Sequence, residues 1–169
     1  MFDLNKVLID GGSLTALFLA IVYVIGRTKP RMFLTPSDIP ADILAAVAPQ
    51  TESEKQLGRL AAIPLMLILT AGTFYSAYTY FLQNHAGFAL LFLHSLAILA
   101  MISLGDLILM DWLILNTITP KWAIFPGTEG FAGYKDYGFH GRAHLKAAPL
   151  LLFGAAISAG LVLLAGAIF

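Results

Sequence analysis

Cysteine is absent from the 169-residue sequence, which excludes disulfides, iron–sulfur clusters, cysteine nucleophiles and thiolate metal sites. Any metal would have to be bound by histidine, aspartate or glutamate. Charge is scarce as well, at 12% of the residues against about 25% in a soluble domain. Lys and Arg together number ten, as do Asp and Glu, so the chain lacks the basic excess that nucleic acid binding requires.

Apolar residues dominate instead, at 59% of the sequence, and the mean hydropathy is +0.81. A helix needs about 20 apolar residues to cross the hydrocarbon layer. Four stretches are long enough: 7–26, 60–82, 86 to about 115, and 147–169. We therefore expect an all-α integral membrane protein, a single transmembrane domain over 1–169 that forms a four-transmembrane-helix bundle in a lipid bilayer. The first stretch lacks a cleavage site of the Ala-x-Ala type and is expected to be a retained span rather than a signal peptide.

Lys and Arg are distributed very unevenly among the connections. Five lie in 27–59, four lie in 116–146, and only Lys6 lies elsewhere. Because basic residues are retained in the cytoplasm, we expect these two loops to be cytoplasmic and both termini to lie outside, in the cytoplasmic membrane of a prokaryote. Three tyrosines are then expected to anchor the second span at the outer interface: Tyr75, Tyr78 and Tyr80.

The first cytoplasmic loop carries two helix signals. Within 37–47, a short amphipathic helix is predicted, with Ser37 as N-cap and Pro40 in the first turn. Its apolar stripe consists of Ile39, Ile43, Leu44 and Val47. Because its polar side offers aspartates, we expect it to pack under the bundle rather than to bind anionic lipid. Further on, Thr51 and Glu54 have the spacing of a capping box, which predicts that the second helix begins about two turns before its apolar stretch.

Ionisable residues inside a membrane are costly, so each is a functional candidate. The expected spans contain Asp10, His94, Asp106 and Asp111. Asp10 is close enough to the end of its span to reach the headgroups, and a lone membrane histidine such as His94 is expected to hydrogen-bond a neighbouring Ser or Tyr. Asp106 and Asp111 are about 140° apart on an α-helix, so they should not share a face. Asp106 is favoured as the inward-facing group.

The second cytoplasmic loop concentrates ionisable and aromatic residues. If the segment before the fourth span is helical, Asp136, His140 and His144 lie along one face, although Gly138 and Gly141 weaken that helix. A His-x-x-x-His pair on one face can bind a divalent metal, and carboxylates can complete the shell. Iron, zinc or manganese would suit this donor set. The predicted metal ligands are Asp106, Asp136, His140 and His144. The predicted catalytic groups are Asp106, Asp111, Glu129 and His140.

These polar groups allow two other interpretations. In the first, Asp106 and Asp111 pair with basic side chains at the interface, namely Lys121, Arg142 or Lys146. In the second, the chain binds haem, which requires two histidines at matching depth on facing helices. Only His94 lies well inside a span, so haem is not expected.

The leading hypothesis is a membrane-embedded enzyme or cofactor-binding protein that acts on a lipid-soluble substrate at the cytoplasmic interface. Two alternatives stay open: a small ion-coupled transporter or channel, with Asp106 and His94 as carriers, and a structural or accessory subunit of a membrane complex. The fourth span also has small residues four apart, which allow close helix approach. They are Gly154 with Ser158 and Ala156 with Gly160. Packing within the chain and a homo-oligomer through the fourth span both fit this pattern.

Overall fold

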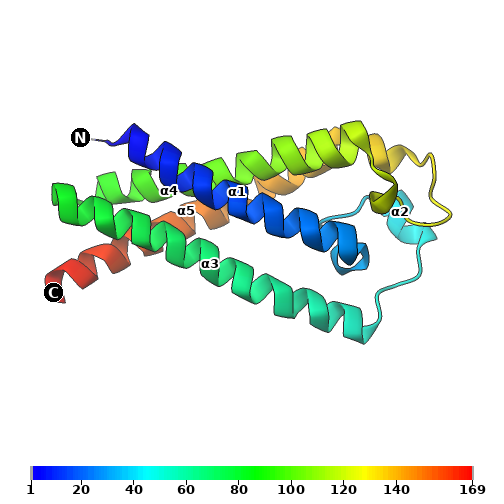
Figure 1. Ribbon diagram of the computed structural model, residues 1–169, viewed down its shortest axis with the longest axis horizontal. Helices are drawn as coiled ribbons and strands as arrows, with labels where there is room; N and C mark the ends of the chain where they lie inside the picture. Colours follow the sequence, from blue (N-terminus) through cyan, green and yellow to red (C-terminus); the bar gives the residue numbers. More distant parts are fainter. Residues whose placement is uncertain (1, 169) are drawn as a thin grey trace. The chain divides into compact units, whose positions relative to one another are not determined.

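The computed structural model describes residues 2–168, which contain helices and no strands. Within this range, four helices are long and apolar enough to cross a membrane: Leu4–Thr28, Glu52–Asn84, Phe88–Ile118 and Tyr137–Ile168. The prediction of an all-α protein with four spans is confirmed. Figure 1 shows the spans coloured in chain order, from the blue N-terminal helix to the red end of the C-terminal helix.

The spans are α1 (Leu4–Thr28), α3 (Glu52–Asn84), the pair α4 (Phe88–Gly105) and η2 (Asp106–Ile118), and α5 (Tyr137–Ile168). The third span is compound, because its second part, η2, is a π-helix. Short elements occupy the connections. They are η1 (Pro30–Phe33), α2 (Ala41–Ala46), η3 (Lys121–Ala123) and η4 (Ala132–Lys135).

Local capping explains where two of the long helices begin. The Thr51 N–H donates to Glu54 Oε2 at 2.8 Å and the Glu54 N–H donates to Thr51 Oγ1 at 3.2 Å, which confirms the predicted capping box. The helix α5 begins at Tyr137, well before its apolar stretch. Asp136 Oδ1 accepts the Phe139 N–H at 2.9 Å and so satisfies one of the free donors of the first turn. This segment is helical despite its two glycines.

The chain divides into two compact units. Unit 1 comprises Met1–Phe18, Leu65–Leu104 and Ala147–Phe169. It contains parts of α1, α3, α4 and α5, together with both ends of the chain and the turn between α3 and α4. Its two apolar clusters are formed by Ala77, Tyr80, Ala86, Leu91, Ala159 and Val162, and by Val7, Leu69, Ile98 and Ile102.

The small residues of the fourth span pack mainly inside unit 1. Ser158 is buried and accepts a hydrogen bond from Ser95 Oγ on α4 at 3.0 Å. A side chain at Gly154 would contact Leu99, whereas one at Gly160 would meet open space. The Gly154 and Ser158 face therefore serves packing within the chain, and the homo-oligomer stays a prediction.

Unit 2 comprises Leu19–Pro64 and Gly105–Lys146. Its apolar core consists of Leu34, Ile43 and Phe125, with Ile39, Leu44, Val47, Phe131 and Tyr134 packed around them. The predicted stripe of the amphipathic helix thus packs against the second connection. The helix itself is shorter than predicted, and Pro40 is its N-cap rather than part of its first turn. The reason is a preceding turn, in which the N–H groups of Asp38 and Ile39 bind the Thr35 carbonyl.

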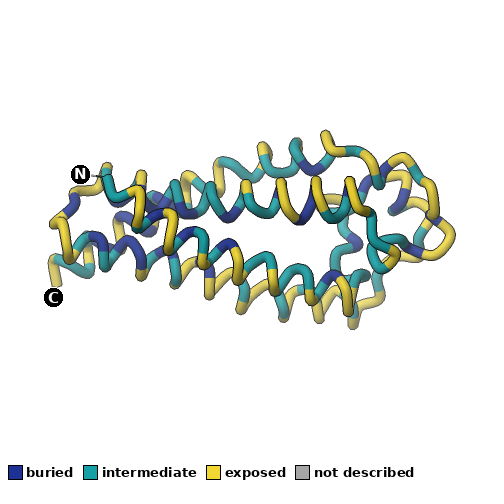
Figure 2. Tube along the Cα trace, turned by 45° about the horizontal axis from the view of Figure 1, so that its top comes forward, coloured by how far each residue is buried: buried dark blue, intermediate teal, exposed yellow. Residues whose placement is uncertain are grey.

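Large apolar side chains are exposed along all four spans. The yellow segments of Figure 2 mark the exposed residues along the chain. Examples are Ile9, Leu67, Leu104 and Phe153. Exposing such apolar surfaces to water would be unfavourable, whereas contact with lipid tails carries no such free-energy cost. The exposed surface is therefore that of an integral membrane protein.

Candidate metal centre

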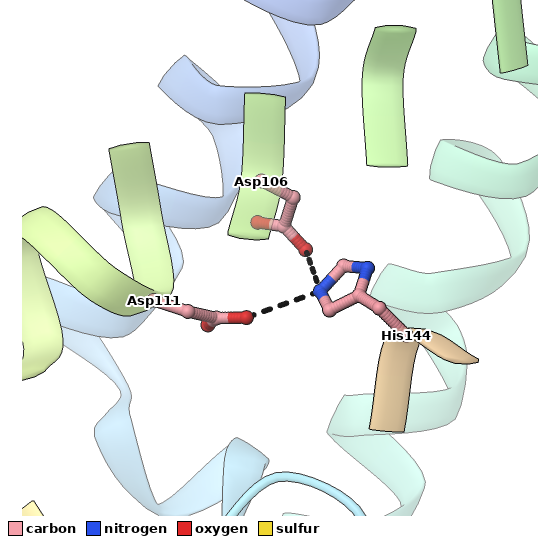
Figure 3. Close-up of side chains that lie close together, drawn as sticks. All are labelled: Asp106, Asp111 and His144. Atoms are coloured by element: carbon pink, nitrogen blue, oxygen red, sulfur yellow. Dashed lines mark hydrogen bonds and ion pairs between the residues drawn. The ribbon is translucent and has the colours of Figure 1, made fainter. Parts of the chain in front are cut away.

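Three ionisable side chains from two elements of unit 2 point toward one another (Figure 3). Asp106 and Asp111 come from η2, and His144 comes from α5. His144 Nε2 lies 3.1 Å from Asp111 Oδ2 and 3.9 Å from Asp106 Oδ2. One ligand atom from each residue lies within 4.8 Å of the others, a spacing that a single metal ion could bridge.

The π-helix brings the two aspartates to the same side, which corrects the expectation that they face apart. In a π-helix each turn is closed by a hydrogen bond to the fifth residue along the chain, so residues five apart lie on the same face, as residues four apart do in an α-helix. One such backbone bond closes the end of η2, where the Thr119 N–H donates to the Ile114 carbonyl at 2.8 Å. The Thr117 side chain also spans five residues, since its Oγ1 donates to the Trp112 carbonyl at 2.7 Å. The expectation assumed α-helical geometry.

Polar contacts from the next connection hold the end of η2. Trp112 Nε1 donates to the Tyr137 carbonyl at 3.0 Å, and Asn116 Nδ2 donates to the Tyr134 carbonyl at 3.0 Å. Lys135 Nζ donates to the carbonyls of Asn116 and Thr117 at 2.6 and 3.1 Å, where a cation satisfies carbonyls that the helix end leaves free. The start of α5, and with it His144, is thereby fixed against η2.

Burial differs among the three side chains and reverses the predicted order of the aspartates. The exposed fraction of the side chain is 11% for Asp111, 19% for His144 and 23% for Asp106. Asp111, rather than Asp106, is the more inward-facing group.

His140 lies one turn before His144 on α5 and contacts the other oxygen of the same aspartate. Its Nδ1 is 3.4 Å from Asp111 Oδ1, and its side chain is 8% exposed. Asp111 therefore contacts both imidazoles, one with each carboxylate oxygen. His140 does not belong to the group of three ligand atoms, so its position suits orientation of Asp111 rather than metal ligation.

The other two predicted site residues lie elsewhere in unit 2. Asp136 caps α5 and accepts a hydrogen bond from Arg142 at 3.3 Å. Glu129 is exposed and accepts the Gly127 N–H at 3.0 Å within its own turn. The structure does not bring either carboxylate to the group of Asp106, Asp111 and His144.

Basic side chains do not neutralise the aspartates in the described part of the chain. Among residues 2–168, the ion pairs of Asp106 and Asp111 are formed with imidazoles, whereas Arg142 pairs with Asp136. The interfacial pairing with Lys121, Arg142 or Lys146 is therefore not what the structure shows. Within residues 2–168, the groups paired with the two carboxylates are thus imidazoles, which are charged only when protonated.

A small cavity of about 40 Å³ lies beside His140 in unit 2. Its polar lining includes Asp38, Asn116 and Tyr134. Burial raises the pKa of Asp38 above its usual value, and nearby Asp111 adds to the effect, while hydrogen bonds from Thr35 and Ser37 oppose it. Asn116 Oδ1 is buried and has no hydrogen-bond partner within residues 2–168. A cavity of this size can hold water, which would satisfy that oxygen.

No family model, curated protein or solved structure matches this chain. Its function must therefore be inferred from its own geometry.

Sequence reasoning did not place Asn116 and Asp38 beside His140. Asn116 stood out as a polar residue within an apolar helix end, on a polar line with His94 that Asp106 flanks, but that line gave no sign of the cavity. Asp38 gave no comparable signal, because an aspartate near a predicted helix start is expected to cap the helix. Its place beside His140 depends on contacts between the two connections of unit 2.

Proposed function

We propose that the chain is a membrane-embedded enzyme or cofactor-binding protein that uses a divalent metal and acts on a lipid-soluble substrate at the cytoplasmic interface. The observation that carries this proposal is the convergence of Asp106, Asp111 and His144, whose ligand atoms lie within 4.8 Å of one another. Two carboxylate oxygens and one imidazole nitrogen suit iron, manganese or zinc.

The distances support a shared ion. Ligand atoms about 2.1 Å from one metal stand about 3 to 3.4 Å apart when they are adjacent in its coordination sphere. The 3.1 Å between His144 and Asp111 fits this range, and a small rotation of the Asp106 carboxylate would bring its 3.9 Å contact into it. Three protein ligands leave coordination positions for water or substrate, as in catalytic rather than structural metal sites.

The electrostatics of the site favour a cation. Asp106 and Asp111 lie in a helix whose other residues are mostly apolar, and charges in such surroundings are retained only with a partner. A divalent ion would neutralise both carboxylates at once. When bound, it would supply a Lewis acid and lower the pKa of a bound water molecule.

His140 is placed to support that chemistry. Through Asp111 it would orient a metal ligand, and its ring also lines the small cavity of unit 2. A histidine held by a carboxylate next to a cavity can exchange a proton with a bound group. We assign His140 this general acid and base role.

The exposed surface around the site supports a substrate from the lipid phase. On η2, two exposed large apolar side chains lie between the two aspartates and two more follow Asp111: Ile108, Leu109, Trp112 and Leu113. Leu145, next to His144 on α5, is 75% exposed. A lipid-soluble molecule could reach the polar group along such surfaces without crossing water.

The test is metal binding by the purified full-length protein in lipid nanodiscs. After treatment with a chelator, the protein is titrated with Mn²⁺, Fe²⁺ or Zn²⁺, and bound metal is measured by elemental analysis. We expect one ion per chain in the wild type and loss of this stoichiometric binding in Asp111→Asn and His144→Ala.

Matched controls separate the site from general effects. Asp136→Asn removes a carboxylate of the same unit that caps α5, and His85→Asn removes an exposed histidine of the turn between α3 and α4. Both should still bind one ion. A wild-type protein that binds no ion, or site variants that bind as well as the controls, would refute the proposal.

A further inference from the structure

A second polar network lies in unit 1, away from the three metal-site residues in the sequence and built from three other helices. Lys6 and Asp10 come from α1, Ser76 from α3 and His94 from α4. Asp10 Oδ2 accepts hydrogen bonds from Lys6 Nζ at 2.8 Å and from Ser76 Oγ at 2.6 Å. Ser76 Oγ lies 2.9 Å from His94 Nε2, so the hydroxyl connects the carboxylate to the imidazole.

The end of this network formed by His94 and Ser76 is completely buried. His94 is 0% exposed and Ser76 is 1% exposed. The expectation that His94 would bond a neighbouring Ser or Tyr is confirmed. Tyr80 stacks on the His94 ring with centroids 4.7 Å apart, so it is a buried core residue and not the interfacial anchor predicted from the sequence. At the other end of the network, the Asp10 side chain is 29% exposed.

The positions of the hydrogens follow from the chemistry of the three groups. An ionised carboxylate can only accept, so the single hydrogen of the Ser76 hydroxyl must point to Asp10. The hydroxyl oxygen is then free only to accept, and His94 Nε2 must carry a hydrogen. In the neutral ring, Nδ1 consequently has a bare lone pair.

That lone pair is the feature the packing leaves unexplained. His94 Nδ1 is buried and has no hydrogen-bond partner among the residues that the structure describes. A buried acceptor without a donor is costly, and native proteins keep few of them. Because no donor occupies this lone pair, Nδ1 is free to take up a proton.

We propose that His94, Ser76 and Asp10 form a proton relay, in which His94 Nδ1 takes up a proton and Asp10 Oδ2 receives one. When a proton binds at Nδ1, the Nε2–H bond breaks and that hydrogen forms the new O–H bond of Ser76. The original hydrogen of Ser76 leaves for Asp10 Oδ2. The relay ends with a carboxylic acid at Asp10, an intact hydroxyl at Ser76 and a neutral imidazole protonated on Nδ1.

The charges of unit 1 are arranged for such a transfer. The charged groups near the ring are Asp3, Lys6 and Asp10, all from α1 or the residue before it. The parts of α3, α4 and α5 in unit 1 contain no Asp, Glu, Lys or Arg, and Tyr80 is the titratable group that they place against His94. The proton therefore moves from the apolar surroundings of His94 toward the charged pair of Lys6 and Asp10. Ionisable residues inside membranes mark proton pathways in other membrane proteins.

The relay can be tested in the intact protein with ¹⁵N-labelled histidine. Nuclear magnetic resonance of the protein in nanodiscs reports which ring nitrogen of His94 carries hydrogen, and infrared spectroscopy reports protonation of Asp10. His94→Gln and Asp10→Asn assign the two signals. We expect the Nε2–H form at alkaline pH, and on acidification we expect Nδ1 to gain hydrogen in the same step in which the Asp10 carboxylic acid appears.

Variants of Ser76 separate a relay from mere packing. Ser76→Ala should abolish the coupling, so that His94 and Asp10 titrate in separate steps. Ser76→Thr retains a hydroxyl and should restore the single step. The control Ser95→Ala removes another buried hydroxyl of unit 1, whose partner is Ser158, and should leave the step unchanged.

Three results would overturn the relay. They are a hydrogen on Nδ1 at alkaline pH, a common titration step that survives in Ser76→Ala, and an Asp10 signal that never changes with His94 in the wild type. Because the relay shares no residue with the metal centre, either proposal can fail while the other stands.

Discussion

At the scale of single residues, Asp111 connects the two histidines of unit 2, because its two oxygens contact two different imidazoles. Oδ2 lies 3.1 Å from His144 and Oδ1 lies 3.4 Å from His140. In the proposed metal centre these contacts differ in kind. His144 would bind the ion directly, and His140 would act on the ion only through Asp111.

Substitution of His140 should therefore weaken metal binding without abolishing it. We expect His140→Ala to lower the affinity for Zn²⁺ about 10- to 100-fold, as is usual for the partner of a metal ligand. Competition with a chromogenic chelator measures this affinity in nanodiscs. Should His140→Ala lose the ion as completely as His144→Ala, His140 would be a ligand, and our assignment of its role would be wrong.

Asp38 should make the stability of the protein depend on pH. Because burial raises its pKa in the folded state, the folded chain holds this proton more tightly than the unfolded chain. Protonation therefore favours folding. The contribution is complete below the ordinary value of 3.8 and is lost as the pH rises through the raised value.

The measurement is the thermal unfolding midpoint of the wild type and of Asp38→Asn over a pH series that begins below 3.8. The neutral amide cannot titrate, so the wild type should lose stability relative to the variant as the pH rises. Parallel curves for the two proteins would contradict this account of Asp38.

At the scale of elements, the π-helical geometry of η2 is the feature that the sequence did not predict. The residue types of the site were evident, since aspartates in an apolar helix end and histidines one turn apart are conspicuous. Their convergence was not, because the angle between Asp106 and Asp111 was derived for an α-helix. Nothing in the apolar sequence between them distinguishes a π-helix from an α-helix. The capping box and the amphipathic stripe were predictable because each depends on neighbouring residues alone.

The absence of native cysteine allows a direct test of the π-helix. Two double variants pair His144→Cys with either Asp106→Cys or Asp111→Cys, and a short bifunctional thiol reagent is added. Both pairs should cross-link, since both aspartates face His144 (Figure 3). A third pair, Ile108→Cys with His144→Cys, is the control, because the Ile108 side chain is 50% exposed. An α-helix would place the two aspartates about 140° apart and permit only one of the two cross-links.

At the scale of the whole molecule, charge separates the two units. Unit 1 contains one basic residue, Lys6, and two acidic residues, Asp3 and Asp10. Unit 2 contains the other nine basic and eight acidic residues. The basic residues that predict the cytoplasmic side therefore belong to the unit that carries Asp106, Asp111 and His144. The chain ends and the turn between α3 and α4 belong to the unit with almost no charge.

This partition leads to a prediction of topology. Single cysteines replace Gln83, in unit 1, and Glu129, in unit 2, both of which are exposed. A membrane-impermeant maleimide is added to intact cells and then to lysed cells. Because lysines and arginines resist translocation, Gln83→Cys should react in intact cells and Glu129→Cys only after lysis. If instead Glu129→Cys reacts in intact cells and Gln83→Cys only after lysis, the metal centre would face outward, and a substrate that arrives from the cytoplasm could not be its natural one.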